Sequence, residues 1–269
     1  MNLSDAQRHR MGNCLSALCP RRSVVFDLDA SDEEVLLQCR KHLAAQSEAQ
    51  RRSVAAEAEK MSLCQATGAN RLDVMMFLIE EKKVDVNAAD ESQNASEDYP
   101  IFHTRLKGVP ELPHAAKLLL AAKANPNQEN GFGWTPLMMN KMNSPTGVID
   151  VLIKGGADVN KKTRNTAIKD AAWNGANAVV KRLIEAKANL EMRGDSMRGD
   201  SHWTVLQAAV AASYCNADPT GEKVHLDMVK SLLEAGAQIS SLEADDIPRT
   251  SDEMKKLLKA HGWAEPGTC

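Results

Sequence analysis

One phrase recurs five times along this chain of 269 residues: an apolar helix end, a stop, and a short polar–apolar closing. The copies lie at residues 76–87, 117–127, 150–160, 181–191 and 230–240. Their equivalent leucines, Leu78, Leu119, Leu152, Leu183 and Leu232, are separated by 41, 33, 31 and 49 residues. A period near 33 predicts a solenoid of stacked units, and the two longer intervals indicate insertions.

Two stretches carry a family resemblance. Residues 133–137 read Gly-Trp-Thr-Pro-Leu and residues 155–160 read Gly-Gly-Ala-Asp-Val-Asn. They resemble the G-x-T-P-L opening and the G-A-D-V-N closing of the ankyrin repeat, and degraded openings stand at residues 61–66, 165–168 and 203–206. The resemblance covers residues 61–263 and implies an all-α ankyrin-repeat solenoid of helix-turn-helix units with short β-hairpin fingers.

The motif residues have physical roles in such a repeat. In the opening, threonine is expected to cap the first helix and proline to occupy its first turn. Gly155 or Gly236 is expected to end the second helix as a left-handed residue. The usual histidine of the family is replaced, which predicts weaker bonding between neighbouring units. The replacements are Cys64, Phe102, Met138, Lys169 and Gln207.

The resemblance divides the chain into four parts. Residues 1–30 are expected to be a disordered tail, and residues 31–60 one capping helix that begins at a capping box of Ser31 and Glu34. Residues 61–263 form the array of about five repeats and a C-terminal cap helix, and residues 264–269 a tail. The inserted residues are expected in loops, at 91–99, 107–113, 192–201 and 216–223.

Composition narrows the class of protein. A net charge of −3 gives no reason to expect nucleic-acid binding, since phosphate neutralisation needs a basic surface. The six cysteines form no CxxC pair and have no histidine at metal-ligand spacing, so neither a metal site nor another cofactor is expected. There is no apolar run long enough to cross a membrane, and a cytoplasmic protein is predicted.

Partner binding is expected at the finger tips and on the exposed face of the first helices, where ankyrin-repeat proteins usually hold protein partners. The positions that fall there are Phe132, Trp134, Met142, Trp173, Asn174 and Trp203. Aromatic side chains dominate the binding energy of many interfaces. The alternative is that Trp134 and Trp203 pack along neighbouring fingers.

A second candidate binding element lies in the N-terminal tail. Arg22, Val24 and Phe26 resemble the basic-x-Val-x-Phe docking motif of protein phosphatase 1 partners. Such a segment binds by adding a strand to a sheet edge, while the two apolar side chains fill pockets. The resemblance implies a targeting subunit for that phosphatase; the alternative is a tail with a short apolar patch.

A lipid anchor is conceivable in the same tail. If translation starts at Met11, Gly12 becomes a myristoylation site and Cys14 a neighbouring palmitoylation site. Two acyl chains would attach the protein stably to a membrane surface. As the sequence is written, Gly12 is internal and is not modified by this route.

An enzymatic alternative rests on residues 24–29, Val-Val-Phe-Asp-Leu-Asp. They resemble the first motif of haloacid-dehalogenase-like phosphatases, in which Asp27 would be the nucleophile and Asp29 the acid/base. The residues that follow are expected to be helical repeats rather than the strands this chemistry needs. The favoured function is therefore a non-catalytic adaptor or scaffold that binds proteins.

Overall fold

The computed structural model describes residues 27–89, 99–105, 112–139, 146–163, 165–193, 203–215, 219–242 and 250–264. Its helical elements are α2 (Asp32–Ala45), α3 (Glu48–Ala58), α4 (Leu63–Gly68), α5 (Leu72–Glu80), η1 (Pro100–Arg105), α6 (Leu112–Ala121), η2 (Pro136–Met138), α7 (Thr146–Lys154), α8 (Ala167–Trp173), α9 (Asn177–Glu185), α10 (Val205–Cys215), α11 (Pro219–Glu234), η3 (Ile239–Ser241) and α12 (Asp252–Ala260). Within these ranges no residue belongs to a strand, so the all-α class is confirmed.

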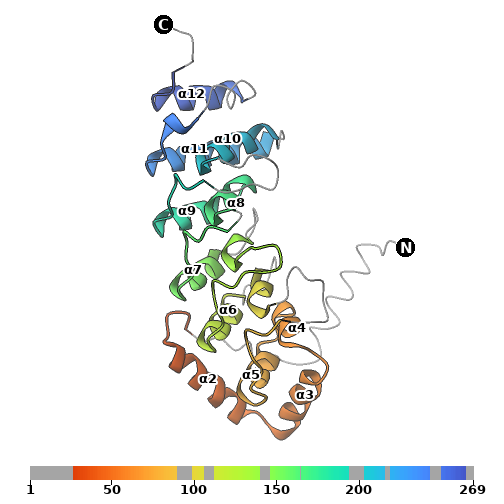
Figure 1. The fold of residues 1–269 in the computed structure, drawn as a ribbon. Helices are drawn as coiled ribbons and strands as arrows, with labels where there is room; N and C mark the ends of the chain where they lie inside the picture. The colour runs from red at the N-terminus through yellow and green to blue at the C-terminus, as the bar shows by residue number, and fades with distance from the viewer. Residues whose placement is uncertain are drawn as a thin grey trace, which may run out of the picture.

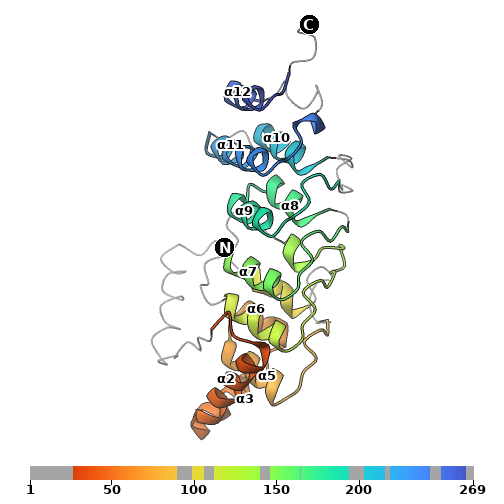
Figure 2. The same cartoon turned by 90° about the vertical axis from the view of Figure 1, so that its left-hand side faces the viewer.

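The elements stack in chain order as five two-element repeats, seen from two sides in Figures 1 and 2. The pairs are α4 with α5, η1 with α6, η2 with α7, α8 with α9, and α10 with α11. We call the side formed by the first element of each pair, with the fingers, the inner face. The side formed by the second helices is the outer face. Successive second helices contact one another, as do α8 and α10 among the first helices.

A single apolar core runs through the whole stack, from Ala30 to Leu258. All five leucines that defined the repeat in the sequence, Leu78, Leu119, Leu152, Leu183 and Leu232, are buried in it. Burial of the equivalent side chain in each second helix shows that the sequence period is the structural period.

The second helices end on a left-handed residue that differs in type from repeat to repeat. It is Lys83, Lys123, Gly156, Lys187 or Gly236. The following N–H then bonds back to the helix, as from Ala157 to the Leu152 carbonyl at 2.9 Å. The expectation that Gly236 is left-handed was correct. The same expectation for Gly155 was wrong, because the residue with the positive φ, of 91°, is its neighbour Gly156.

The openings cap their helices in different ways. Ser62 and Gln65 form a capping box, each side chain bonding the other's backbone N–H, and Thr204 and Gln207 do the same. Gln65, rather than Cys64, therefore holds the first repeat's histidine position. In the third repeat the expected cap is wrong: the Thr135 side chain makes no capping bond, and only a short 3-10 turn follows it.

The fingers are built from turns rather than from paired strands. Their backbone bonds close locally, as from Gln128 N–H to the Asn125 carbonyl at 3.3 Å and from Lys161 N–H to the Asp158 carbonyl at 3.2 Å. The β-hairpin character expected of the fingers is therefore not found in the described residues. Side chains make the bonds between fingers instead.

Residues 31–60 were expected to form one helix, but the structure has two, α2 and α3. The helical segment is interrupted at Ser47, which caps the start of α3 in a capping box with Gln50. Arg51 then donates to the Leu43 carbonyl at 3.0 Å and so satisfies the end of α2. The break turns α3 onto α5, while α2 lies along α5 and α6 on the outer face (Figure 1).

Two of the expected insertion loops are shorter than the sequence suggested. Helix α6 already begins at Leu112, with Pro113 in its first turn, and α11 begins at Pro219. Proline is favoured at these positions because the N–H groups of the first helical turn have no acceptor within the helix, so the N–H that proline lacks is not missed. Most of the loop expected at residues 192–201, from residue 194 onward, lies outside the described residues.

Candidate protein-binding surface

A hydrogen-bonded loop presents Phe132 on the finger that precedes the third repeat. Asn130 is buried, and its side-chain oxygen accepts from the N–H groups of Phe132 at 3.0 Å and Trp134 at 2.9 Å. Gly133 allows the turn through its positive φ of 74°. Phe132 is 45% exposed, an unusual exposure for an aromatic ring on so well-bonded a loop.

The Trp134 ring packs against the Phe132 ring. The two rings lie with centroids 5.8 Å apart and planes tilted by 44°. Trp134 is partly buried against the apolar core. Packing is thus the main role of Trp134, and Phe132 is the member of the pair that is available to a partner.

A second aromatic pair lies one repeat further along the inner face. Trp173, at the end of α8, and Trp203, just before α10, have ring centroids 6.0 Å apart and planes tilted by 39°. Both side chains are partly exposed. Asn174 is exposed beside Trp173, and its amide group donates to the Asp170 carbonyl at 2.8 Å.

A half-buried carboxyl, that of Asp170, lies on α8 three residues before Trp173. Asp170 accepts a hydrogen bond from the Asn165 side-chain amide at 2.5 Å. Burial raises the pKa of the Asp170 carboxyl to about 6, against the lowering effects of Asn165 and Lys169. The Asp170 carboxyl therefore changes charge close to neutral pH.

The structure thus brings five of the six predicted surface residues to the inner face in two aromatic pairs with Asn174. Met142 lies outside the described residues, as do Gly12, Cys14, Arg22, Val24 and Phe26. The sequence reasoning missed Asn130. The sequence carried a signal for it, because the Asn-Gly pair at residues 130–131 favours a turn in which the asparagine side chain bonds the backbone.

Asp27 and Asp29 lie in a turn that leads into α2. The Asp27 carboxylate accepts from the Asp29 N–H at 2.9 Å, and the Asp29 carboxylate is paired with Lys154 of α7. The Lys154 hydrogen bond and charge lower the pKa of Asp29. An ion-paired Asp29 with a lowered pKa is a poor acid/base, so this arrangement gives no support to the phosphatase-enzyme alternative.

Asp32 makes the second contact of this segment with the outer face. It accepts from Lys123 at 2.9 Å and lies 3.5 Å from the Lys117 ammonium. The hydrogen bond from Lys123 is the main cause that lowers the pKa of Asp32. We call residues 27–32 the clasp, since they fasten the start of α2 to α6 and α7.

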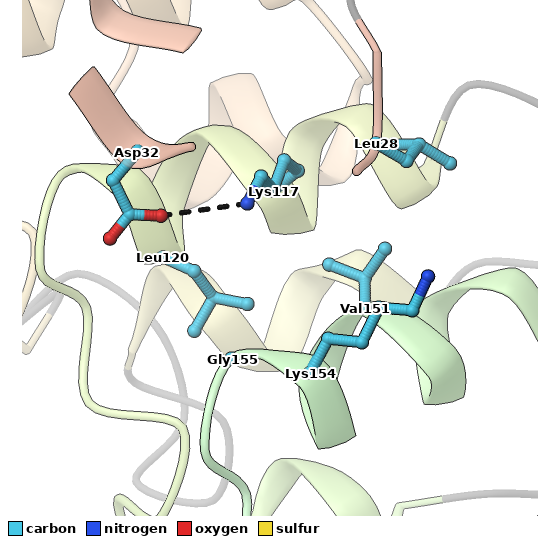
Figure 3. A pocket seen from close by; sticks show the side chains of 7 residues that line it. All are labelled: Leu28, Asp32, Lys117, Leu120, Val151, Lys154 and Gly155. Carbon is cyan, nitrogen blue, oxygen red and sulfur yellow. Dashed lines mark hydrogen bonds and ion pairs between the residues drawn. The ribbon is translucent and has the colours of Figure 1, made fainter. Parts of the chain in front are cut away.

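A small pocket of about 170 Å³ remains beneath the clasp (Figure 3). It is lined by Leu28, Asp32, Lys117, Leu120, Val151, Lys154 and Gly155. Figure 3 shows Asp32 pointing toward Lys117, with Leu28 and Lys154 among the other lining side chains. Sites for organic ligands usually measure about 300–1,000 Å³, so the pocket is a packing gap under the clasp.

The described residues give little support to a metal site, a membrane-spanning helix or a reactive cysteine. No group of three or more histidine, cysteine, aspartate or glutamate side chains could hold a metal ion there. No helix in the same part of the chain is long and apolar enough to cross a membrane. Cys39 and Cys64 are buried, and burial raises the pKa of the Cys39 thiol to about 12.

Comparisons with known proteins agree with this geometry. A family model described as ankyrin repeats (3 copies) matches residues 106–194. A human ankyrin repeat domain, that of ASB11, superposes with a TM-score of 0.60 at 22% identity, over 76% of this chain and 85% of that one. An ankyrin repeat domain of Acinetobacter baumannii AYE (ABAYE2397) gives 0.57 at 23%, over 74% and 97%. No curated protein sequence matches the chain.

Residues 106–194 match the ankyrin-repeat family model, and the described residues share the ankyrin-repeat fold. The repeats form a protein–protein interaction domain, and a fold of this type is typically a non-catalytic binding module. Fold alone names no partner, because partner choice depends on the side chains of the exposed faces.

Proposed function

We propose that this protein is a non-catalytic scaffold that holds a protein partner on its inner face through Phe132 and the Trp173–Trp203 pair. The observation that carries the proposal is the exposed Phe132 ring on a loop whose backbone is hydrogen-bonded to the Asn130 side chain. A rigid aromatic side chain loses little conformational entropy on binding, and such residues often contribute most of the binding energy. A reducing, cytoplasmic setting belongs to the same proposal, since the buried Cys39 is a free thiol.

The test compares three single substitutions in an affinity purification followed by quantitative mass spectrometry. Phe132→Ala and Trp173→Ala should each reduce partner recovery about tenfold or more, as an anchor worth at least 1.4 kcal/mol requires. Leu37→Ala is the matched control, because Leu37 is a 47% exposed apolar residue on α2. Recovery that stays unchanged in both aromatic variants, with unfolding transitions like the wild type's, would refute the proposal.

A narrower proposal is that residues 22–26 dock the catalytic subunit of protein phosphatase 1, which would make the chain a targeting subunit. Its support is the order Arg22, Val24, Phe26 in the sequence and the position of this motif directly before the clasp. A docking segment next to an anchored residue would hold its enzyme close to the repeats.

Purified phosphatase catalytic subunit tests this narrower proposal directly. The double variant Val24→Ala/Phe26→Ala should lose binding in a pull-down, because both pocket-filling side chains are gone. Val25→Ala is the matched control, since it lies between the two anchors and fills neither pocket. Equal recovery of the phosphatase by the wild type and the double variant removes the docking hypothesis.

Membrane attachment is a separate proposal that depends on translation from Met11. Gly12→Ala should then abolish recovery of the protein with membranes, and Cys14→Ser should weaken it, because one acyl chain alone binds only marginally. Terminal peptides that begin solely at Met1 would rule this proposal out.

A further inference from the structure

The Trp173–Trp203 pair lies where two consecutive first helices of the inner face meet. Trp173 ends α8 and Trp203 directly precedes α10, and these two helices contact each other (Figure 2). The ring centroids are 6.0 Å apart and the planes are tilted by 39°, so the rings do not lie flat on each other. Both side chains are partly exposed, which leaves part of the indole surface open to a partner.

Hydrogen-bond acceptors accompany this aromatic pair. Asp170 lies three residues before Trp173 on α8, and side chains three residues apart on a helix are neighbours on one side of it. One Asp170 carboxylate oxygen accepts from the Asn165 amide at 2.5 Å, and no described residue donates to the other oxygen. Asn174 is exposed directly after Trp173, and its amide nitrogen, not its oxygen, makes the bond to the Asp170 carbonyl. Acceptors therefore lie beside the rings.

The folded chain stabilises the Asp170 carboxylate poorly. Within the fold, the positive charge that acts on it is that of the buried Lys169, which lowers the pKa. Burial outweighs this effect and raises the pKa of Asp170 to about 6. Among the described residues, no lysine or arginine stacks on Trp173 or Trp203. A cation brought by a partner would find both an aromatic surface and a carboxylate that gains from its charge.

The other aromatic pair of the inner face differs in this respect. Phe132 and Trp134 have Glu129 nearby in the sequence, but that carboxylate is already paired with Lys161 at 2.9 Å. The Phe132 pair thus offers a mainly apolar surface. The contrast assigns a different kind of side chain to each pair.

We infer that Trp173, Trp203 and Asp170 form a recognition site for an arginine side chain of the protein partner. Guanidinium is planar and weakly hydrated, stacks on aromatic rings, and donates from several N–H groups at once. In this site it lies against the indole rings and donates to the Asp170 carboxylate. The inference rests on the proposed function for the presence of a partner, and it adds the chemical group that the partner must carry there.

Small probes test the site without knowledge of the partner. N-acetyl-arginine amide is titrated at neutral pH into the isotope-labelled full chain, and NMR follows the indole N–H signals of Trp173 and Trp203. We expect saturable shifts of both signals, with a dissociation constant on the order of millimolar. N-acetyl-citrulline amide is the matched control probe, because it keeps the shape and lacks the charge. It should bind about tenfold more weakly.

Substitutions separate the contributions of the carboxylate and the rings. Asp170→Asn keeps the size of the side chain and should weaken binding of the arginine probe by about tenfold, with little effect on the citrulline probe. Glu129→Gln is the matched control, since it makes the same charge change on the same face at an acid that is already paired. Trp203→Phe keeps an aromatic ring with a weaker attraction for cations and should weaken binding by about two- to threefold.

Equal binding of the arginine and citrulline probes, or no saturable shift of the Trp173 and Trp203 signals, would overturn the inference. An Asp170→Asn variant that binds the arginine probe as tightly as the wild type would do the same. If Asp170→Asn alters the unfolding transition, the comparison of the two probes on the wild type still decides. Failure of the scaffold function is seen separately, as unchanged partner recovery by Phe132→Ala and Trp173→Ala. Lost recovery without preference for the arginine probe keeps the scaffold and removes the arginine site.

Discussion

The Asn127 side chain joins the second and third repeats through two hydrogen bonds to one finger. Its amide group donates to the Gly156 carbonyl at 3.0 Å, and its oxygen accepts from the Asp158 N–H at 2.7 Å. Asn87 makes the same pair of bonds one repeat earlier, to the Lys123 carbonyl and the Asn125 N–H. Side chains thus link the fingers that lack strand pairing.

Asn127→Ala should therefore lower the free energy of unfolding by about 1–3 kcal/mol, since two hydrogen bonds are lost and their partners are left behind. Asn127→Asp should cost less than the alanine substitution, because a carboxylate still accepts from Asp158 but cannot donate to Gly156. Urea unfolding followed by circular dichroism measures both. Asn174→Ala, which removes an exposed amide within its own repeat, is the control. Equal midpoints for Asn127→Ala and the wild type would contradict this account of the fingers.

The left-handed residue after each second helix leads to a stabilising substitution. Lys187 has a positive φ of 63°, which costs a residue with a side chain more than it costs glycine. Lys187→Gly should raise the free energy of unfolding by about 0.5–1 kcal/mol. Lys123 occupies the equivalent place but is unsuitable, because its ammonium bonds Asp32.

The reverse substitution tests the same idea in the fifth repeat. Gly236 has a φ of 95°, and a side-chain carbon added there would meet no atom within 4 Å. Gly236→Ala should therefore be destabilising by about 1 kcal/mol through backbone strain alone. Thermal unfolding of the two variants beside the wild type should show shifts of opposite sign, and shifts of the same sign would contradict the argument.

Much of the fold could be read from the chain because the repeated leucines and openings are local and periodic signals. The break of residues 31–60 into α2 and α3 was less visible, since Ser47 and Gln50 form a capping box inside an otherwise helical pattern. The clasp had no signal at all. Asp29 and Lys154 are 125 positions apart, and only the stacking of repeats brings an exposed aspartate to an exposed lysine.

The candidate surface was predictable in part for the same reason. Trp173 ends the first helix of the fourth repeat and Trp203 directly precedes the opening of the fifth, so the period placed both on the inner face. The different roles of Phe132 and Trp134 did not, because adjacent aromatic residues give no sign of which one packs on the core. That distinction depends on the loop that Asn130 organises.

Asp170 should make the protein more stable on mild acidification. Its folded-state pKa of about 6 lies above the ordinary value of 3.8, so the native state binds the proton more tightly than the unfolded state. The free-energy cost of burying the Asp170 carboxylate is fully present above pH 6 and disappears as the pH falls toward 4. Asp170→Asn should stabilise the protein at pH 7 by roughly 1–3 kcal/mol and should lose this advantage near pH 4. Urea titrations at a series of pH values measure the difference, and an advantage that is independent of pH would exclude Asp170 as its source.

His225 should act in the opposite direction. The ring lies in α11 with 1% exposure, and its Nδ1 has no hydrogen-bond partner among the described residues. Burial lowers the pKa of His225 below the ordinary 6.5, because the charged ring is poorly solvated there. The unfolded state therefore takes up the proton first, and the stability present above pH 6.5 falls as the pH drops through that value. His225→Leu keeps an apolar side chain in the same space and should flatten this fall, whereas His261→Leu, at an exposed site, controls for the loss of a histidine. Unfolding midpoints of the three proteins between pH 5 and 8 provide the comparison. An equally steep acid loss in His225→Leu would show that other groups destabilise the fold in acid.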